Sequence, residues 1–129
     1  MLTFEQAQEA LTGIADALPT AIYKKLNGGI IVLPEEKQHE QAINGDLFVL
    51  GEYRCEPQGF GRYIVIYYGS LHRTYGHLSD ALFCKKLEEV LHHELVHHLE
   101  NLAGDTSLEL KDAIEMEQYR RAHQKKVEN

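Results

Sequence analysis

The segment from Glu88 to Glu100, EEVLHHELVHHLE, contains four of the eight histidines of the chain, arranged as two adjacent pairs. Within it, residues 93 to 97 read H-E-L-V-H and fit the pattern H-E-x-x-H. On a helix, residues four apart lie one turn above each other on the same face, so both imidazoles can bind one ion. The spacing therefore predicts a metal site on a helix, with His93 and His97 as ligands of one Zn²⁺ per chain.

Glu94 follows the first of these histidines and is predicted to point to the side of the metal. There it can reach a metal-bound water rather than the ion itself. Zinc lowers the pKa of such a water to about 7, and a carboxylate can take its proton as a general base. The pattern predicts a zinc-dependent peptidase with Glu94 as the catalytic residue. Other divalent transition metals also accept imidazole and carboxylate ligands, so the identity of the metal stays open.

A catalytic zinc usually has three protein ligands and a water, and the sequence offers several acidic residues for the third position. Asp105 is the first expectation, because it follows a glycine at which the chain can turn back towards the metal. Asp112 and Glu115 on the next predicted helix are alternatives. Glu100, three residues after the second histidine, is expected to support a ligand rather than to bind directly.

Other residues are candidates for supporting roles. His92 and His98 lie on other faces of the helix, where surface or hydrogen-bonding positions are expected. Four residues before the helix are candidate donors to an oxyanion: His72, Arg73, Tyr75 and His77. An extended peptide substrate can also pair with an exposed strand edge, for which residues 47–52 and 62–68 are both candidates.

The elements that position these residues are predicted to form one α+β domain over residues 1–129. Helix-like spacing of apolar residues and β-branched runs indicate three helical and three strand segments. The expected helices are 4–18, with a short second piece to about 26, 80–103 and 106–124, and the expected strands are 30–33, 47–52 and 62–68. Residues 69–77 are predicted to be a loop or a short turn. Turn residues at 56–61 indicate that the second and third strands are antiparallel.

The H-E-L-V-H-H segment at 93–98, followed by LENLAGDTSL at 99–108, resembles the minimal zincin-like metallopeptidase family of bacteria. Further stretches carry the resemblance over most of the chain: LNGGIIVLP at 26–34, LGEY at 50–53, GRYIVIYYGS at 61–70 and YGH at 75–77. The resemblance implies a short zincin-like fold, with a small, twisted, mostly antiparallel sheet beside the active-site helix. The spacer before Asp105 is longer than in many members, so the third ligand matches less closely than the histidines do.

Composition and charge narrow the range of partners. The chain has 129 residues, 43% of them hydrophobic, and a net charge of −7. This charge disfavours nucleic acid and anionic membranes, since both attract positive surfaces. The two cysteines give no disulfide pattern, and no secretory or membrane-spanning segment is evident, so a cytoplasmic monomer is expected. A peptide or protein substrate is the expected partner. The alternatives are a metal- or peptide-binding module without turnover and an adaptor without metal.

Overall fold

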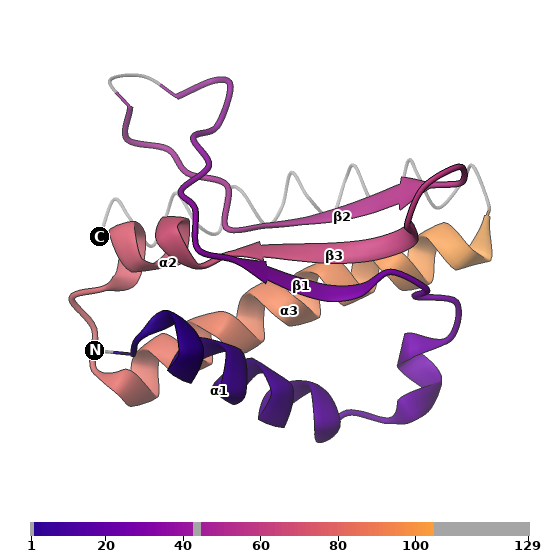
Figure 1. The fold of residues 1–129 in the computed structure, drawn as a ribbon, viewed down its shortest axis with the longest axis horizontal. Coiled ribbons are helices and arrows are strands. Elements are labelled where there is room, and N and C mark those ends of the chain that lie inside the picture. Colours follow the sequence, from indigo (N-terminus) through magenta and orange to yellow (C-terminus); the bar gives the residue numbers. More distant parts are fainter. Residues whose placement is uncertain (1, 43–44, 105–129) are drawn as a thin grey trace.

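The computed structural model describes residues 2–42 and 45–104, which contain helices packed on one side of a small sheet (Figure 1). In chain order the elements are α1 (Phe4–Asp16), the 3-10 helix η1 (Thr20–Tyr23), β1 (Gly29–Leu33), β2 (Gly51–Glu56), β3 (Gly61–Tyr67), α2 (Tyr68–Tyr75) and α3 (Asp80–Ala103). This arrangement confirms the α+β class. The helix predicted over 106–124 lies outside the described residues.

Both long helices begin where the sequence predicts and α3 also ends there, whereas α1 ends at Asp16, two residues before the expected end at 18. The Thr3 side chain accepts a hydrogen bond from the Gln6 amide at 3.2 Å, and the Gln6 side chain accepts one from the Thr3 amide at 2.9 Å. The Ser79 side chain accepts from the amide of Leu82 at 3.3 Å and starts α3. At the other end, Gly104 adopts a φ of 63°, a left-handed conformation that costs glycine little, and ends the helix.

The sheet has the order β1–β3–β2, with β1 parallel and β2 antiparallel to the central strand β3. The antiparallel pairing of β2 and β3 is confirmed, but the expectation of a mostly antiparallel sheet is wrong. Although β2 follows β1 in the sequence, the two strands are not neighbours in the sheet, because β3 lies between them. Its residues from Tyr63 to Tyr67 are all buried. The most apolar strand thus occupies the position where both edges and both faces are covered.

Two segments differ from the prediction. The strand expected at 47–52 is displaced: β2 begins at Gly51, and residues 47–49 instead pair with residues 37–39 through an isolated bridge between Gln38 and Phe48. The loop expected at 69–77 is largely the helix α2. There Ser70 and Leu71 are fully buried, and a Cβ at Gly69 would lie 2.5 Å from the backbone carbon of Glu35. Tertiary packing therefore overrides the weak helix propensity of this segment.

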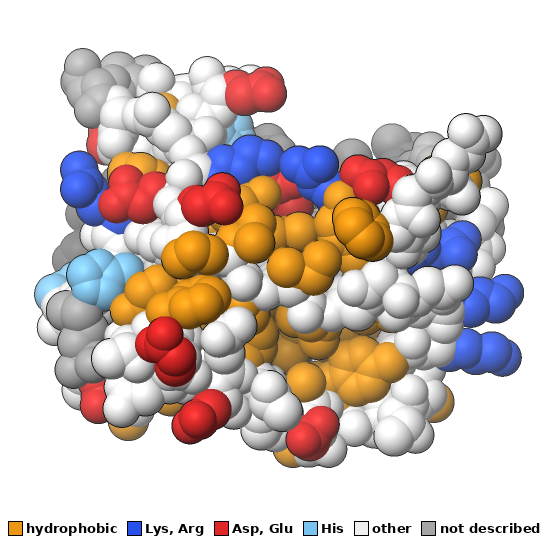
Figure 2. Space-filling model, viewed as in Figure 1, with side chains coloured by type: hydrophobic (Ala, Val, Ile, Leu, Met, Phe, Trp, Pro, Cys, Tyr) orange, Lys and Arg blue, Asp and Glu red, His pale blue; other side chains and the backbone are white. Residues whose placement is uncertain are grey.

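The main core lies between the sheet and the helices α1 and α3. Successive side chains of a strand point to opposite faces, so Ile64 and Ile66 face the helices while Tyr63, Val65 and Tyr67 face the other way. Figure 2 shows hydrophobic side chains gathered over β1 and between β1 and α1, with acidic side chains nearby. Among the described helices, none is long and apolar enough to cross a membrane.

Candidate metal and active site

The central part of α3 presents one face to β2. Val90, His93, Glu94 and His97 stand at positions i, i+3, i+4 and i+7, which share one side of a helix. Helix α3 packs against β2 and β3, and the chain buries Glu94 to 6% exposure, whereas the two histidines are half-buried. The three residues predicted from the H-E-x-x-H pattern are therefore held together between a helix and a strand.

The two imidazoles converge in the way that a shared metal ion requires. The Nε2 atoms of His93 and His97 are 3.3 Å apart, and the rings are nearly perpendicular, with an interplanar angle of 89°. Two nitrogens bound to one tetrahedral zinc, each about 2.0–2.1 Å from it, are separated by roughly 3.3–3.4 Å. The donor type and the spacing of this pair thus fit two ligands of one zinc ion.

The third ligand is not found among residues 2–42 and 45–104, where no group of three His, Cys, Asp or Glu side chains is arranged to hold a metal. Asp105, the first expectation, and the alternatives Asp112 and Glu115 all lie outside this part of the chain. Glu100 is half-buried on α3 but completes no such group with the histidine pair.

Glu94 is a buried carboxyl group with an unusual acidity. Burial is the largest influence and raises its pKa to about 7 from the ordinary value of 4.5. The negative charge of Glu52 contributes to this rise, and a hydrogen bond from the backbone N–H of Tyr53 opposes it. A carboxyl group whose pKa lies near neutral pH can both accept and release a proton there, which is what a general base needs.

Gly51 allows β2 to approach the active helix closely. A Cβ at this position would lie 2.8 Å from Cγ1 of Val90, 3.3 Å from the carbonyl oxygen of Val65 and 3.4 Å from Cγ of Glu94. Valine is stiff at χ1 and a backbone oxygen cannot rotate away, so any larger residue would push the strand from the helix. The amide of Tyr53, two residues on, reaches the Glu94 carboxylate because of this close approach.

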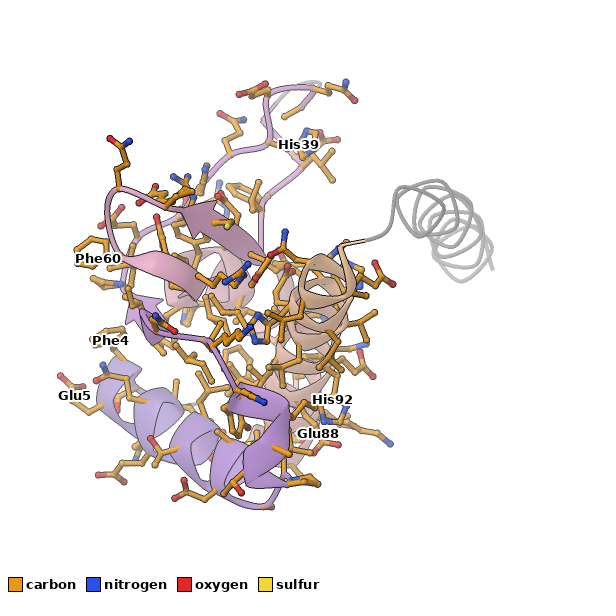
Figure 3. The ribbon with its side chains drawn as sticks, turned by 90° about the vertical axis from the view of Figure 1, so that its right-hand side faces the viewer. Phe4, Glu5, His39, Phe60, Glu88 and His92 are labelled. Atoms are coloured by element: carbon orange, nitrogen blue, oxygen red, sulfur yellow. The ribbon has the colours of Figure 1, made fainter. Side chains whose placement is uncertain are left out.

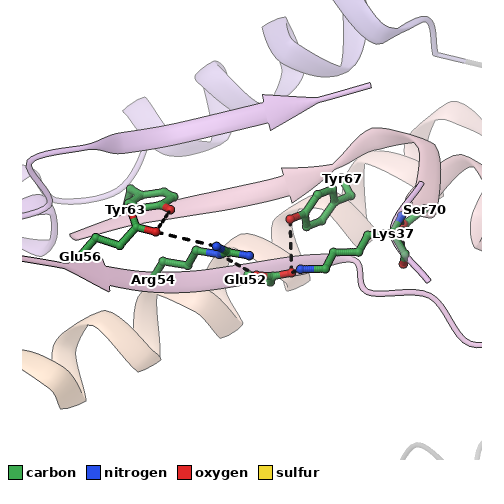
Figure 4. Close-up of polar contacts among 7 residues, drawn as sticks. All are labelled: Lys37, Glu52, Arg54, Glu56, Tyr63, Tyr67 and Ser70. Atoms are coloured by element: carbon green, nitrogen blue, oxygen red, sulfur yellow. Dashed lines mark hydrogen bonds and ion pairs between the residues drawn. The ribbon is translucent and has the colours of Figure 1, made fainter. Parts of the chain in front are cut away.

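A row of charged side chains runs along β2 beside the site (Figure 4). Glu52 forms ion pairs with Lys37 and with Arg54, whose Nε lies 2.8 Å from the carboxylate, and accepts a hydrogen bond from the Tyr67 hydroxyl at 3.3 Å. Burial alone would raise the pKa of Glu52, but the hydrogen bonds from Lys37 and Arg54 outweigh it and hold the pKa below its usual value. Glu52 is therefore a fixed negative charge near Glu94.

His98, the last residue of the second histidine pair, is fully buried and bridges three segments. Its Nε2 lies 2.9 Å from the carbonyl oxygen of Lys24, and its Nδ1 lies 2.9 Å from the hydroxyl of Tyr53. A carbonyl can only accept, so Nε2 carries a proton; in the neutral ring Nδ1 accepts from Tyr53. Tyr53 thus contacts Glu94 through its backbone and His98 through its side chain. His92, by contrast, is exposed on the outer side of α3 (Figure 3).

A cavity of about 560 Å³ opens beside His93 and Glu94. Besides these two residues its walls are formed by Lys37, Gln38, His39, Glu40, Phe48, Val49, Leu50, Gly51, Glu52 and Val90. None of the four oxyanion-donor candidates, His72, Arg73, Tyr75 and His77, lines it. They lie in α2 and just after it, before α3 begins, although Arg73 stands over the ring of Phe48, which lines the cavity.

The fold and the site together define a class: a small α+β protein in which a helix-borne histidine pair lies beside a buried carboxyl group. No family model matches the chain, and the search of curated proteins found no match. A solved structure is similar, that of a conserved hypothetical protein from Thermus thermophilus, with 33% sequence identity and a TM-score of 0.67. The match covers 79% of this chain and 98% of the other. The chain belongs to the same family as that protein.

Proposed function

We propose that this protein is a zinc-dependent metallopeptidase in which His93 and His97 bind the metal and Glu94 is the general base. One observation carries the proposal. The Nε2 atoms of His93 and His97 are 3.3 Å apart, and between these residues in the sequence stands Glu94, which is 6% exposed and has a pKa of about 7. A surface motif kept only for solubility would not need a buried, protonatable carboxyl group between its histidines. An acidic residue, with Asp105 the first candidate, completes the ligand set in this proposal.

A bound zinc ion supplies a Lewis acid that makes a water molecule acidic and polarises a peptide carbonyl. The residues of the chain supply the rest. Glu94 takes the proton from the attacking water and passes it to the leaving amine, and its pKa suits both transfers. The Tyr53 amide fixes one carboxylate oxygen of Glu94, so the other can face the substrate.

The substrate main chain is proposed to pair with the outer edge of β2. Of the two candidate edges, the 62–68 segment is excluded, because β3 is flanked by strands on both sides. In the described part of the chain no other strand pairs with the outer edge of β2, and β2 itself packs against α3. A zincin-like fold, a cytoplasmic location and a peptide or protein substrate belong to the same proposal.

The test compares the wild type with Glu94→Gln, both supplied with zinc. We expect the wild type to cleave peptides from a broad library, and we expect Glu94→Gln to bind zinc equally well but to lose at least about a hundredfold in kcat, as is typical for a general base. Equal cleavage by both proteins would refute the assigned role of Glu94. Zinc binding without cleavage by either would favour the alternative of a binding module without turnover.

A further inference from the structure

The cavity beside His93 and Glu94 extends one helical turn along α3 towards its N-terminus. Val90 is the next residue of the same helix face, one turn before Glu94, and forms part of the wall. Phe48, Val49 and Leu50, just before β2 begins, contribute further apolar lining. A group placed in this cavity would therefore lie beside Glu94 and beside His93, one of the two proposed metal ligands.

The volume suits part of a peptide. At about 560 Å³ the cavity lies within the range of roughly 300–1,000 Å³ that ligand pockets have. The space is larger than one side chain needs, so it can hold a large side chain and some of the adjoining main chain. Like most ligand pockets, it combines apolar wall residues, Phe48, Val49, Leu50 and Val90, with polar and charged ones.

The charges around the cavity decide which side chains fit. Among the described residues, three carboxyl groups line it, those of Glu40, Glu52 and Glu94, against the single ammonium group of Lys37. Lys37 is already paired with Glu52, and Arg54 pairs with the same carboxylate from outside the cavity. An acidic side chain of a substrate would be repelled by these carboxylates, and the ammonium group of Lys37 is already paired with Glu52. A lysine or arginine side chain would lose hydration against the apolar walls. Of the three carboxyl groups, Glu52 is already paired with Lys37 and Arg54, Glu40 is exposed to solvent, and Glu94 is buried beside the proposed metal ligands.

We propose that this cavity is the specificity pocket of the enzyme and holds a large apolar side chain, such as that of leucine or phenylalanine, on a residue next to the scissile bond. This inference rests on the proposed function for its reaction, but it assigns a role to further residues of the cavity wall, Phe48, Val49, Leu50 and Val90. It names the substrate class as peptides with an apolar residue beside the cleavage point.

Phe48 offers the clearest variant. Its ring lines the cavity, yet it belongs to neither of the two core clusters, so Phe48→Ala should change the pocket more than the stability. Phe48→Leu keeps an apolar wall and serves as a milder variant if Phe48→Ala folds poorly. Phe60 is the matched control: it is also an aromatic residue, it is 66% exposed, and it lies in the turn between β2 and β3, away from the cavity (Figure 3).

The experiment measures kcat/KM of the zinc-loaded protein on peptides that differ only at the residues beside the cleaved bond, with leucine, phenylalanine, alanine, lysine or aspartate. We expect leucine and phenylalanine to exceed alanine by about tenfold or more, with aspartate the poorest. Phe48→Ala should lower the phenylalanine-to-alanine ratio several-fold, mainly through KM, Phe48→Leu should lie between, and Phe60→Ala should keep the wild-type ratio. Equal rates for all peptides, a preference for lysine, or a ratio unchanged in Phe48→Ala would overturn the inference.

A binding measurement separates this inference from the proposed function. Zinc-loaded Glu94→Gln is mixed with the leucine and aspartate peptides, and the amide NMR signals of Gly51 and Val90 are followed. Selective shifts with the leucine peptide, even if no protein cleaves any peptide, would support the pocket while refuting the peptidase. No binding of the leucine peptide to this variant would overturn the pocket, whether or not the wild type is active.

Discussion

Replacing Glu94 by glutamine should stabilise the metal-free protein at neutral and alkaline pH. The reason is that the folded chain holds this carboxyl group where its charged form is disfavoured. Its pKa is about 7 in the folded state against an ordinary value of 4.5, and each pKa unit corresponds to about 1.4 kcal/mol. The difference of about 2.5 units gives roughly 3 kcal/mol as the cost of ionising Glu94 in the folded protein.

The pH range follows from the sign of the shift. Below the unfolded pKa of 4.5 the group is protonated in both states and contributes no pH dependence. Between 4.5 and about 7 the folded protein keeps a proton that the unfolded chain has lost, so stability falls as pH rises. Above about 7 both states are ionised and the full cost remains. Glutamine does not titrate, so the advantage of Glu94→Gln over wild type should grow by about 3 kcal/mol between pH 4 and pH 8.

Urea denaturation in the presence of a chelator, at pH 4, 6 and 8, measures this difference directly. Glu88→Gln is the matched control, because Glu88 is on the same helix but exposed (Figure 3). Its stability difference from wild type should stay within about 0.5 kcal/mol at every pH. A Glu94→Gln advantage that does not change with pH would refute the claim that Glu94 is buried against its charged form.

Three further predictions concern the surroundings of the site. Gly51→Ala should lower the free energy of unfolding by roughly 1–3 kcal/mol in urea denaturation and reduce peptide cleavage, because the added Cβ would press against Val90. Gly13→Ala should be neutral or stabilising, because its Cβ would meet nothing within 4 Å. His98→Ala should lower the free energy of unfolding by roughly 2–4 kcal/mol in the same assay, because it leaves buried polar partners unpaired. His92→Ala should change it by less than about 0.5 kcal/mol. Equal effects would contradict the different burial of the two histidines. The lowered pKa of Glu52 means that its ion pairs stabilise the protein above pH 4.5 and that this contribution is lost as pH falls below that value. In Glu52→Gln the melting temperature should therefore fall less steeply with decreasing pH than in the wild type. The same decrease in both proteins would show that these ion pairs do not contribute to stability.

Features set by local chemistry were predictable from the sequence. The ends of the helices are set by residues only a few positions away in the chain. Hydrogen bonds to the side chains of Thr3 and Ser79 start two helices, and the left-handed backbone angle of Gly104 ends one. The strand partners were not predictable in the same way. The apolar residues from Leu47 to Leu50 favour a strand, but which strand they pair with depends on where β3 inserts, and the actual β2 is the more polar segment that follows.

In the candidate site, too, the local features were predictable from the sequence and the long-range contacts were not. The spacing of His93, Glu94 and His97 is set by one helix, so the sequence was enough to bring them together. Gly51 and Tyr53 reach Glu94 from a strand about forty residues earlier in the chain, and no sequence spacing indicates that contact. The burial of His98 does have a signal in the sequence: the residue stands four positions after Glu94 and so lies on the same side of the helix.

The central claim, that His93 and His97 bind a catalytic metal, is tested most directly by elemental analysis of the protein purified without a histidine tag. The wild type is compared with a His93→Ala/His97→Ala double variant, both after zinc has been supplied and excess removed. We predict about one zinc ion per chain in the wild type and none in the double variant. No bound zinc in the wild type, or the same amount in both proteins, would contradict the account.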